Sequence, residues 1–435
     1  MNELVRRFFR LSLLNIAANL TVPLAGLVDT AMLGHLEDVS YLAGVSLASI
    51  IFDYIYWTFG FLRMATTGLT AQARGNNDLA ETFQNLARPV LVSLVIAVVI
   101  LGLQVPLALG GFEILSGTEA VKEAGRDYYF IRIWGAPAAL VNFALIGWYL
   151  GREESGKALL MTLSANLTNV LFNYIFIIKL QMAARGAGLA TMLSQYAMLA
   201  VGIVIYLCIK ERPGLTTKQF FAAPKWRKLF RLNSDILLRT VCLVFSFSVF
   251  TNYSSALGVT ILAVNSILRN LMVFAAFLID GASFAVESLV GVFYGQGDGR
   301  RLKYLTFIAL LAGLAYALVF LVLLMGWPDF FLSLFTHHGH LIVELKQYAW
   351  WLVPTLLLGS VAFIFDGFFL GLSRGNILRN TMLLSTVVFF PLAWHARSLG
   401  SNDYLWLSMM VFMGARALFT AAMSRPFLQG RLAAE

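Results

Sequence analysis

The sequence predicts an all-α integral membrane protein with twelve transmembrane helices in two six-helix lobes. A pseudo-two-fold axis along the membrane normal is expected to relate the lobes. Of the 435 residues, 59% are hydrophobic and only 13% are charged, whereas about a quarter of a typical soluble domain is charged. Stretches such as 89–108 and 307–325 carry no charge and reach the ~20 residues that one span needs. Finally, similar motifs recur in both halves.

The apolar stretches between polar segments give the order of the helices. The first six are predicted at residues 8–33, 41–70, 88–110, 127–150, 158–179 and 187–209. The last six are predicted at residues 229–256, 260–294, 303–326, 343–371, 377–396 and 403–423. The longest polar stretch begins at Lys210 and is too short to fold alone. We therefore predict an N-terminal lobe (1–209), a cytoplasmic linker (210–228) and a C-terminal lobe (229–435).

An internal repeat supports the two lobes. Helix two ends in GLTAQARG (68–75) and helix eight ends in VGVFYGQG (290–297). Helix four ends in GWYLGREESG (147–156) and helix ten in GFFLGLSRGN (367–376). Because six is even, a duplicated six-helix unit has the same orientation in both copies. Transporters with such parallel repeats place their substrate sites near the middle of the membrane.

Basic residues predict the orientation of the chain. They concentrate in alternate loops, near residues 6–10, 152–157, 210–231, 300–303, 374–379 and 425–431. Since Lys and Arg are enriched in cytoplasmic loops, both termini are expected in the cytoplasm, with the protein in the cell (inner) membrane. The net charge of +9 is then explained by the basic residues of the cytoplasmic loops, and nucleic acid is not expected as a partner.

The sequence contains few patterns that are typical of enzymes or metal sites. The five histidines lie mostly in predicted loops, and no HExxH or Cys–His spacing is present. The segment GQGDG (295–299) lacks the P-loop pattern. A membrane-embedded enzyme acting on lipids would need a nucleophile–base pair or a metal motif. We therefore expect no catalytic residue, no metal and no cofactor, and an ion gradient as the energy source.

Asp29 is the clearest candidate for chemistry, because an ionisable side chain in hydrocarbon is costly and marks a functional site. A proton carrier must gain and lose its proton as its access to water changes, and burial favours the neutral form of a carboxyl group. Pro23, six residues earlier, removes a helical hydrogen bond and allows a bend. We expect Asp29 to couple protons and Pro23 to act as a hinge. The alternative is that Asp29 only caps or pairs near the outer end of the helix.

Helix five offers a neutral polar face. Asn166, Asn169 and Asn173 lie at i, i+3 and i+7, which places them on one side of a helix. Their amides are able to bind a carboxylic acid, a substrate or water. They are equally able to hold neighbouring helices together.

The second half carries more charge within its predicted spans, and two interpretations remain open for it. The residues are Asp235, Arg239, Asp280, Glu287 and Asp366. Asp235 and Arg239 stand at i, i+4 and are placed to form an ion pair. Asp280 and Glu287, seven residues apart, share a helix face. Together these side chains form either a paired structural network or a second cation site or proton relay.

Three motifs resemble one transporter family. They are VDTAMLGHL (28–36), LRMATTGLTAQ (62–72) and DGASFAVE (280–287), and together they are similar to the multidrug and toxic compound extrusion (MATE) family, in its DNA-damage-inducible protein F (DinF)-like branch. The resemblance extends over essentially the whole chain. It implies an antiporter of two six-helix lobes that alternates between outward- and inward-facing states.

The resemblance also assigns roles to residues. In similar proteins the first-helix acid of the Asp-Thr motif carries the proton, and here that acid is Asp29. Family members often have Asn followed by Asp four residues later on helix five, where this chain has Asn169 and Asn173. The missing carboxylate leaves Asp29 more isolated and disfavours sodium, which prefers several oxygen ligands. Other branches use acids in the second lobe, and Asp366 matches one such position.

The expected function is secondary active multidrug efflux, with organic cations or amphipathic drugs leaving in exchange for protons. The chain is expected to act as a monomer in contact with membrane lipid. Sodium-coupled efflux is one alternative. The other is a flippase for lipid-linked precursors, which would favour a strongly cationic cavity. The intramembrane arginines Arg63, Arg239 and Arg269 are scattered in the sequence and form no such cluster there.

Overall fold

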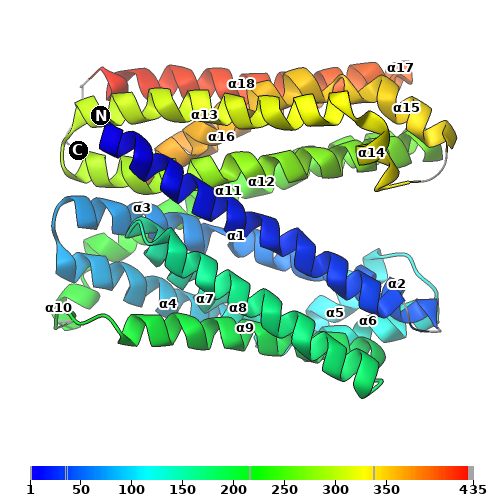
Figure 1. Cartoon of the computed structure of the whole chain (residues 1–435), viewed down its shortest axis with the longest axis horizontal. Coiled ribbons are helices and arrows are strands. Elements are labelled where there is room, and N and C mark those ends of the chain that lie inside the picture. The colour runs from blue at the N-terminus through cyan, green and yellow to red at the C-terminus, as the bar shows by residue number, and fades with distance from the viewer. Residues whose placement is uncertain (1, 35, 37, 215–216, 337–338, 430–435) are drawn as a thin grey trace. The chain divides into compact units, whose positions relative to one another are not determined.

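The computed structural model describes residues 2–34, 36, 38–214, 217–336 and 339–429, with the side chains of 22–25, 27 and 29 outside the description. Within these ranges every secondary-structure element is a helix (Figure 1). Eleven helical stretches of the described chain are long and apolar enough to cross a membrane, and α1 (Asn2–Gly34) is a further helix of 33 residues. The predicted all-α membrane fold is confirmed.

Contacts divide the chain into two compact units. The N-terminal unit comprises Ala17–Lys228, and the C-terminal unit comprises Met1–Ile16 with Leu229–Glu435. α1 and α11 (Ala223–Ala256) therefore contribute residues to both units.

The N-terminal unit is built from helices that are more segmented than hydropathy predicts. They are α2 (Val39–Phe59), α3 (Phe61–Gly75), α4 (Leu79–Gly102), α5 (Gln104–Ile114), α6 (Glu119–Arg132), α7 (Ala136–Gly151), α8 (Ser155–Asn173), α9 (Ala183–Leu207) and α10 (Thr217–Phe220). The predicted helix 41–70 is divided at Gly60, and a π-helical segment (Tyr174–Lys179) continues α8. α4 begins at Leu79, well before residue 88, because the Asp78 carboxylate caps it by accepting the Glu81 N–H at 2.9 Å.

The C-terminal unit has longer helices. They are α11, α12 (Val259–Gly295), α13 (Gly299–Gly326), α14 (Pro328–Ser333), α15 (Gly339–Ala349), α16 (Leu352–Gly371), α17 (Gly375–Leu399) and α18 (Asn402–Leu428). In Figure 1, the axes of α12, α13 and α18 are roughly parallel. The predicted helix 343–371 is two helices, α15 and α16, separated at Trp350 and Trp351. α16 packs against α12, α13 and α18 and is therefore the central helix of this unit.

The repeat predicted from the sequence appears as two equivalent turns. After α3, Asn77 has a left-handed φ of 57°, and the N–H of Asp78 donates to the Ala73 carbonyl at 2.9 Å. After α12, Gly297 has a left-handed φ of 70°, and the N–H of Asp298 donates to the Phe293 carbonyl at 2.9 Å. In both turns the aspartate then caps the next helix. The two halves thus share backbone geometry as well as sequence.

Close helix packing is repeated too. A Cβ added at Gly151 of α7 would lie 2.6 Å from the Thr67 carbonyl oxygen of α3. A Cβ added at Gly371 of α16 would lie 2.6 Å from the Glu287 carbonyl oxygen of α12. Small residues let helix backbones approach closely in membranes. The α3–α7 and α12–α16 pairs are therefore corresponding contacts in the two units.

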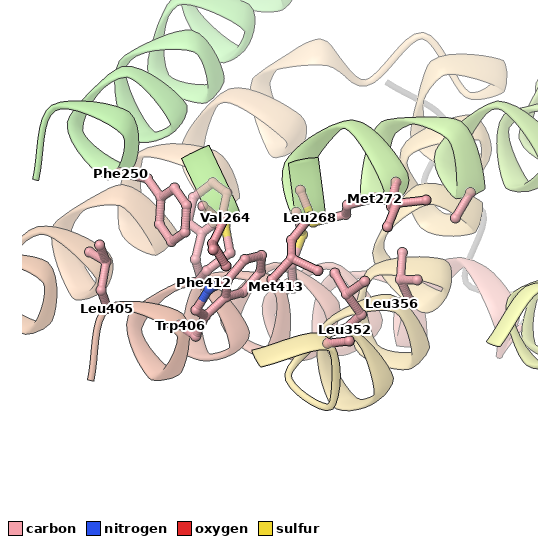
Figure 2. Close-up of a cluster of buried hydrophobic side chains, with 14 of the residues drawn as sticks. Phe250, Val264, Leu268, Met272, Leu352, Leu356, Leu405, Trp406, Phe412 and Met413 are labelled. Carbon is pink, nitrogen blue, oxygen red and sulfur yellow. The ribbon is translucent and has the colours of Figure 1, made fainter. Parts of the chain in front are cut away.

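A cluster of buried apolar side chains lies in the C-terminal unit (Figure 2). The rings of Phe250 and Trp406 meet edge to face with centroids 5.1 Å apart. The indole N–H of Trp406 donates to the Asn265 side-chain oxygen at 2.9 Å, and Asn265 donates to the Asn402 oxygen at 2.7 Å. This core joins α11, α12 and α18 and satisfies the polar atoms that it buries.

Candidate functional site

The predicted proton carrier and hinge lie on α1. The helix runs without interruption from Asn2 to Gly34 and so includes positions 23 and 29. The side chains of Pro23 and Asp29 lie outside the described residues. Their roles in proton coupling and bending stay predictions.

The asparagine face on α8 forms a hydrogen-bonded chain. The Asn173 amide donates to the Asn169 oxygen at 3.1 Å, and the Asn169 amide donates to the Thr191 hydroxyl of α9 at 3.4 Å. Asn173 is fully buried. The amide nitrogen of Asn166 is also buried and has no acceptor in the part of the chain that the structure describes. The asparagine face thus joins α8 to α9, and the Asn166 amide on it is available to donate a hydrogen bond.

An arginine surrounded by aromatic rings lies in the N-terminal unit, and no motif in the sequence predicts that these residues meet. The Arg132 guanidinium is 4.3 Å from the ring centre of Phe52 and 5.4 Å from that of Tyr128. It also donates to the Tyr128 hydroxyl at 2.7 Å and to the Ser49 hydroxyl at 3.3 Å. Aromatic faces attract organic cations through their quadrupole. These rings therefore bind a planar organic cation that is part of the protein, the Arg132 guanidinium.

A buried ionic cluster lies at α16 in the C-terminal unit. The Asp366 carboxylate accepts from Arg239 of α11 and from Arg416 of α18, and both guanidiniums bond the same oxygen, Oδ2. The Arg416 Nη2–Asp366 Oδ2 distance is 2.7 Å. Asp366, Arg239 and Arg416 are 6%, 6% and 1% exposed. Charges so far from water persist because each has an opposite charge as a partner.

Arg416 is a member of this cluster that the sequence analysis missed. Its guanidinium lies 5.2 Å from the Phe363 ring centre and 5.7 Å from that of Phe412. The signal was present, because Arg416 stands alone in the predicted span 403–423 after Asp403, and a charged residue there marks a candidate site. The structure also brings two arginines together that are far apart in the sequence.

Asp235 and Arg239 have different partners. The Asp235 carboxylate pairs with Arg379 of α17 at 2.6 Å, whereas Arg239 pairs with Asp366. The i, i+4 spacing suggested a local ion pair, but tertiary partners on α16 and α17 take its place. Asp235 is 5% exposed and Arg379 is 35% exposed at its side chain, so this second pair lies nearer to the surface of the unit.

Asp280 and Glu287 on α12 occupy different environments. Asp280 is partly exposed and interacts electrostatically with Arg416, so it belongs to the same cluster. Glu287 is fully buried, at the close approach of α12 to Gly371 of α16. Within the described residues no three His, Cys, Asp or Glu side chains gather as a metal site.

Comparison with known proteins agrees with this architecture. The family model MatE matches residues 15–175 and again residues 236–395, so the two matches fall in the two repeats. The chain is 34% identical to DNA damage-inducible protein F of Escherichia coli (strain K12) over 426 residues, covering 97% of this chain and 92% of that protein.

Solved structures share the fold. A MOP superfamily transporter from Pyrococcus furiosus superposes with a TM-score of 0.89 at 19% identity, covering 99% of this chain and 97% of that one. A multidrug resistance MATE family transporter in an outward-facing conformation superposes with a TM-score of 0.86 at 19% identity, covering 98% and 95%. The two matches to the family model and the relative at 34% identity settle the assignment: this chain belongs to the MATE family of multidrug and toxin extrusion transporters.

Proposed function

We propose that this chain exports organic cations and amphipathic compounds in exchange for protons, with Asp29 as the proton carrier. The observation that carries the choice of Asp29 is the pairing of Asp366 with Arg239 and Arg416. Protonating Asp366 would leave two buried guanidiniums without their counter-ion, which is costly. Asp235 is likewise held by Arg379. A proton carrier must alternate between its charged and neutral forms. Asp29 on the first helix is therefore the better candidate.

The asparagine face favours protons over sodium. Asn169 and Asn173 bond to each other and to Thr191, and neither contributes a negative charge. Hard cations prefer several oxygen ligands, carboxylates among them. In this proposal the amides of α8 support a protonation step and do not form a cage for sodium.

The aromatic content of the chain supports an organic cation as cargo, because aromatic faces attract organic cations. Phe52 and Tyr128 bind the Arg132 guanidinium in this way, so a cationic drug would contact other rings. A relative in fold is named for multidrug resistance. The proposal is completed by export by a monomer in the cytoplasmic (inner) membrane. The placement of basic residues supports cytoplasmic termini.

Proton movement in proteoliposomes tests the proposal. The purified full chain is reconstituted without sodium, and a cationic dye is followed under an imposed pH gradient. We expect exchange of dye for protons in the wild type and its loss in Asp29→Asn at equal reconstitution. Full exchange in Asp29→Asn would contradict the role of Asp29. Movement that requires a sodium gradient would favour sodium coupling, and movement of only a polyprenyl lipid would favour a flippase.

A further inference from the structure

Two guanidiniums in the C-terminal unit have more hydrogen-bond donors than acceptors. Arg239 and Arg416 both donate to Oδ2 of Asp366. The Nε atom of each is buried and has no acceptor among the residues that the structure describes. Arg416 Nη1 donates to the sulfur of Met413 at 3.2 Å, and a thioether is a weak acceptor. Because a buried donor without an acceptor is costly, this site is suited to a ligand that supplies oxygen acceptors.

The charge of the cluster points to an anion. Arg239, Arg416 and Asp366 carry two positive charges and one negative charge, and all three are more than nine-tenths buried. Asp280 also acts on Arg416, but it is only partly buried and so is not counted in this fully buried group. One further carboxylate would make the buried group neutral.

The groups around Arg416 indicate what the anion is attached to. The rings of Phe363 and Phe412 lie 5.2 and 5.7 Å from its guanidinium carbon. An arginine presents paired N–H groups that match a carboxylate, and aromatic rings favour an apolar body beside it. We propose that Arg239 and Arg416 form a binding site for carboxylate-bearing amphiphiles, a class of opposite charge to the organic cations of the proposed export.

Asp366 has a defined role in this site. The Asp366 carboxylate already accepts hydrogen bonds from both arginines. It therefore competes with the carboxylate of the ligand for the same donors. A ligand carboxylate either joins Asp366 by accepting from the open Nε groups or takes its place. Removing the Asp366 charge therefore raises affinity for the ligand, while removing either arginine lowers it.

Equilibrium binding to the purified full chain in detergent tests this site without any ion gradient, so the result is independent of the proposed proton coupling. The probes are 2-naphthoate, its neutral isostere 2-naphthamide and the acyl-chain carboxylate decanoate. We expect the wild type to bind naphthoate at least about tenfold more tightly than naphthamide, as a charge-assisted pair with arginine implies. Stronger binding of decanoate than of naphthoate would identify lipid-derived acids as the source, and the reverse would identify aromatic compounds.

Variants locate the binding. Asp366→Asn is expected to tighten naphthoate binding about tenfold, and Arg239→Gln to weaken it about tenfold, as expected for buried charge pairs. Arg379→Gln is the matched control, because it also removes an arginine from a buried aspartate of this unit, and its naphthoate affinity should match the wild type. Equal wild-type affinity for naphthoate and naphthamide would overturn the proposal, and that comparison needs no variant to fold. A preference for naphthoate that survives in Arg239→Gln would also overturn it.

Discussion

Asp366 and Arg416 form a buried ion pair between α16 and α18, with 2.7 Å between Oδ2 and Nη2. Arg239 of α11 bonds the same oxygen, so one carboxylate joins three helices. Such a pair adds little stability over apolar packing, but breaking it is expensive because a charge is left unpaired. The cluster is thus both a link between helices and a place where charge is held inside the membrane.

Asp366→Ala is predicted to destabilise the C-terminal unit more than Arg416→Ala. The first change leaves two buried guanidiniums unpaired, whereas the second leaves Asp366 with Arg239. We expect a loss of about 3–5 kcal/mol for Asp366→Ala, measured as thermal unfolding in detergent. Asp329→Ala is the control, since the Asp329–Lys346 pair has a 76% exposed carboxylate and exposed pairs contribute about 0–1 kcal/mol. Equal losses for the two aspartate variants would contradict the assignment.

The helices could be predicted from the sequence, but their breaks could not. Hydropathy reports the length of chain that is apolar, so it found the spans and the repeat. It does not register caps such as Asp78, which extends α4 into polar sequence. The divisions at Gly60 and at Trp350 and Trp351 are equally invisible, because the apolar pattern continues across them.

The charged site was predicted only in part, because its partners come from different helices. The sequence predicts that Asp366 belongs either to a paired network or to a second cation site, and the structure pairs it with Arg239 and Arg416. Sequence spacing paired Arg239 with Asp235, but spacing describes one helix and says nothing of its neighbours. Arg416 carried the same signal as Asp366 and was overlooked. Asp29 stays a prediction.

Gly371→Ala is predicted to separate α16 from α12. The added Cβ would stand 2.6 Å from the Glu287 carbonyl oxygen and 3.0 Å from the Gly291 nitrogen, both backbone atoms that cannot rotate away. Overpacking of this kind costs about 1–3 kcal/mol. Gly110→Ala is the matched control, because a Cβ there meets nothing within 4 Å. Thermal unfolding of both variants checks this, and a Gly371→Ala protein as stable as Gly110→Ala would show that the helices are not in close contact.

The cap of α2 is predicted to weaken in acid. Hydrogen bonds from the Ser40 hydroxyl and backbone N–H lower the pKa of Asp38 from 3.8. Since the folded pKa lies below the unfolded one, the cap stabilises the first turn above about pH 4 and is lost as the pH falls through the folded pKa. Hydrogen exchange at the Ser40 amide, corrected for its intrinsic rate, should therefore show lower protection in acid. Asp38→Asn keeps an acceptor that does not titrate, and its protection should not change with pH. Equal pH dependence in both proteins would contradict the prediction.

Arg88→Ala is predicted to release the linker from the N-terminal unit. Arg88 of α4 is 2% exposed, and its Nη2 and Nε donate to the carbonyls of Gln219 and Phe220 at 2.9 and 3.2 Å. These bonds satisfy the last carbonyls of α10, which would otherwise lack partners within the helix.

The Glu81 carboxylate pairs with the Arg88 guanidinium at 3.0 Å and orients it toward the linker. Loss of the guanidinium should expose the 217–221 backbone and speed chymotryptic cleavage near Phe220 and Phe221 several-fold. Arg227→Ala, at an exposed position of α11, removes the same charge from the adjoining segment and should cleave at the wild-type rate. Identical cleavage of the Arg88→Ala and Arg227→Ala proteins would mean that Arg88 does not hold the linker, whose position would then depend on the Trp226 indole bond to the Phe220 carbonyl at 2.8 Å.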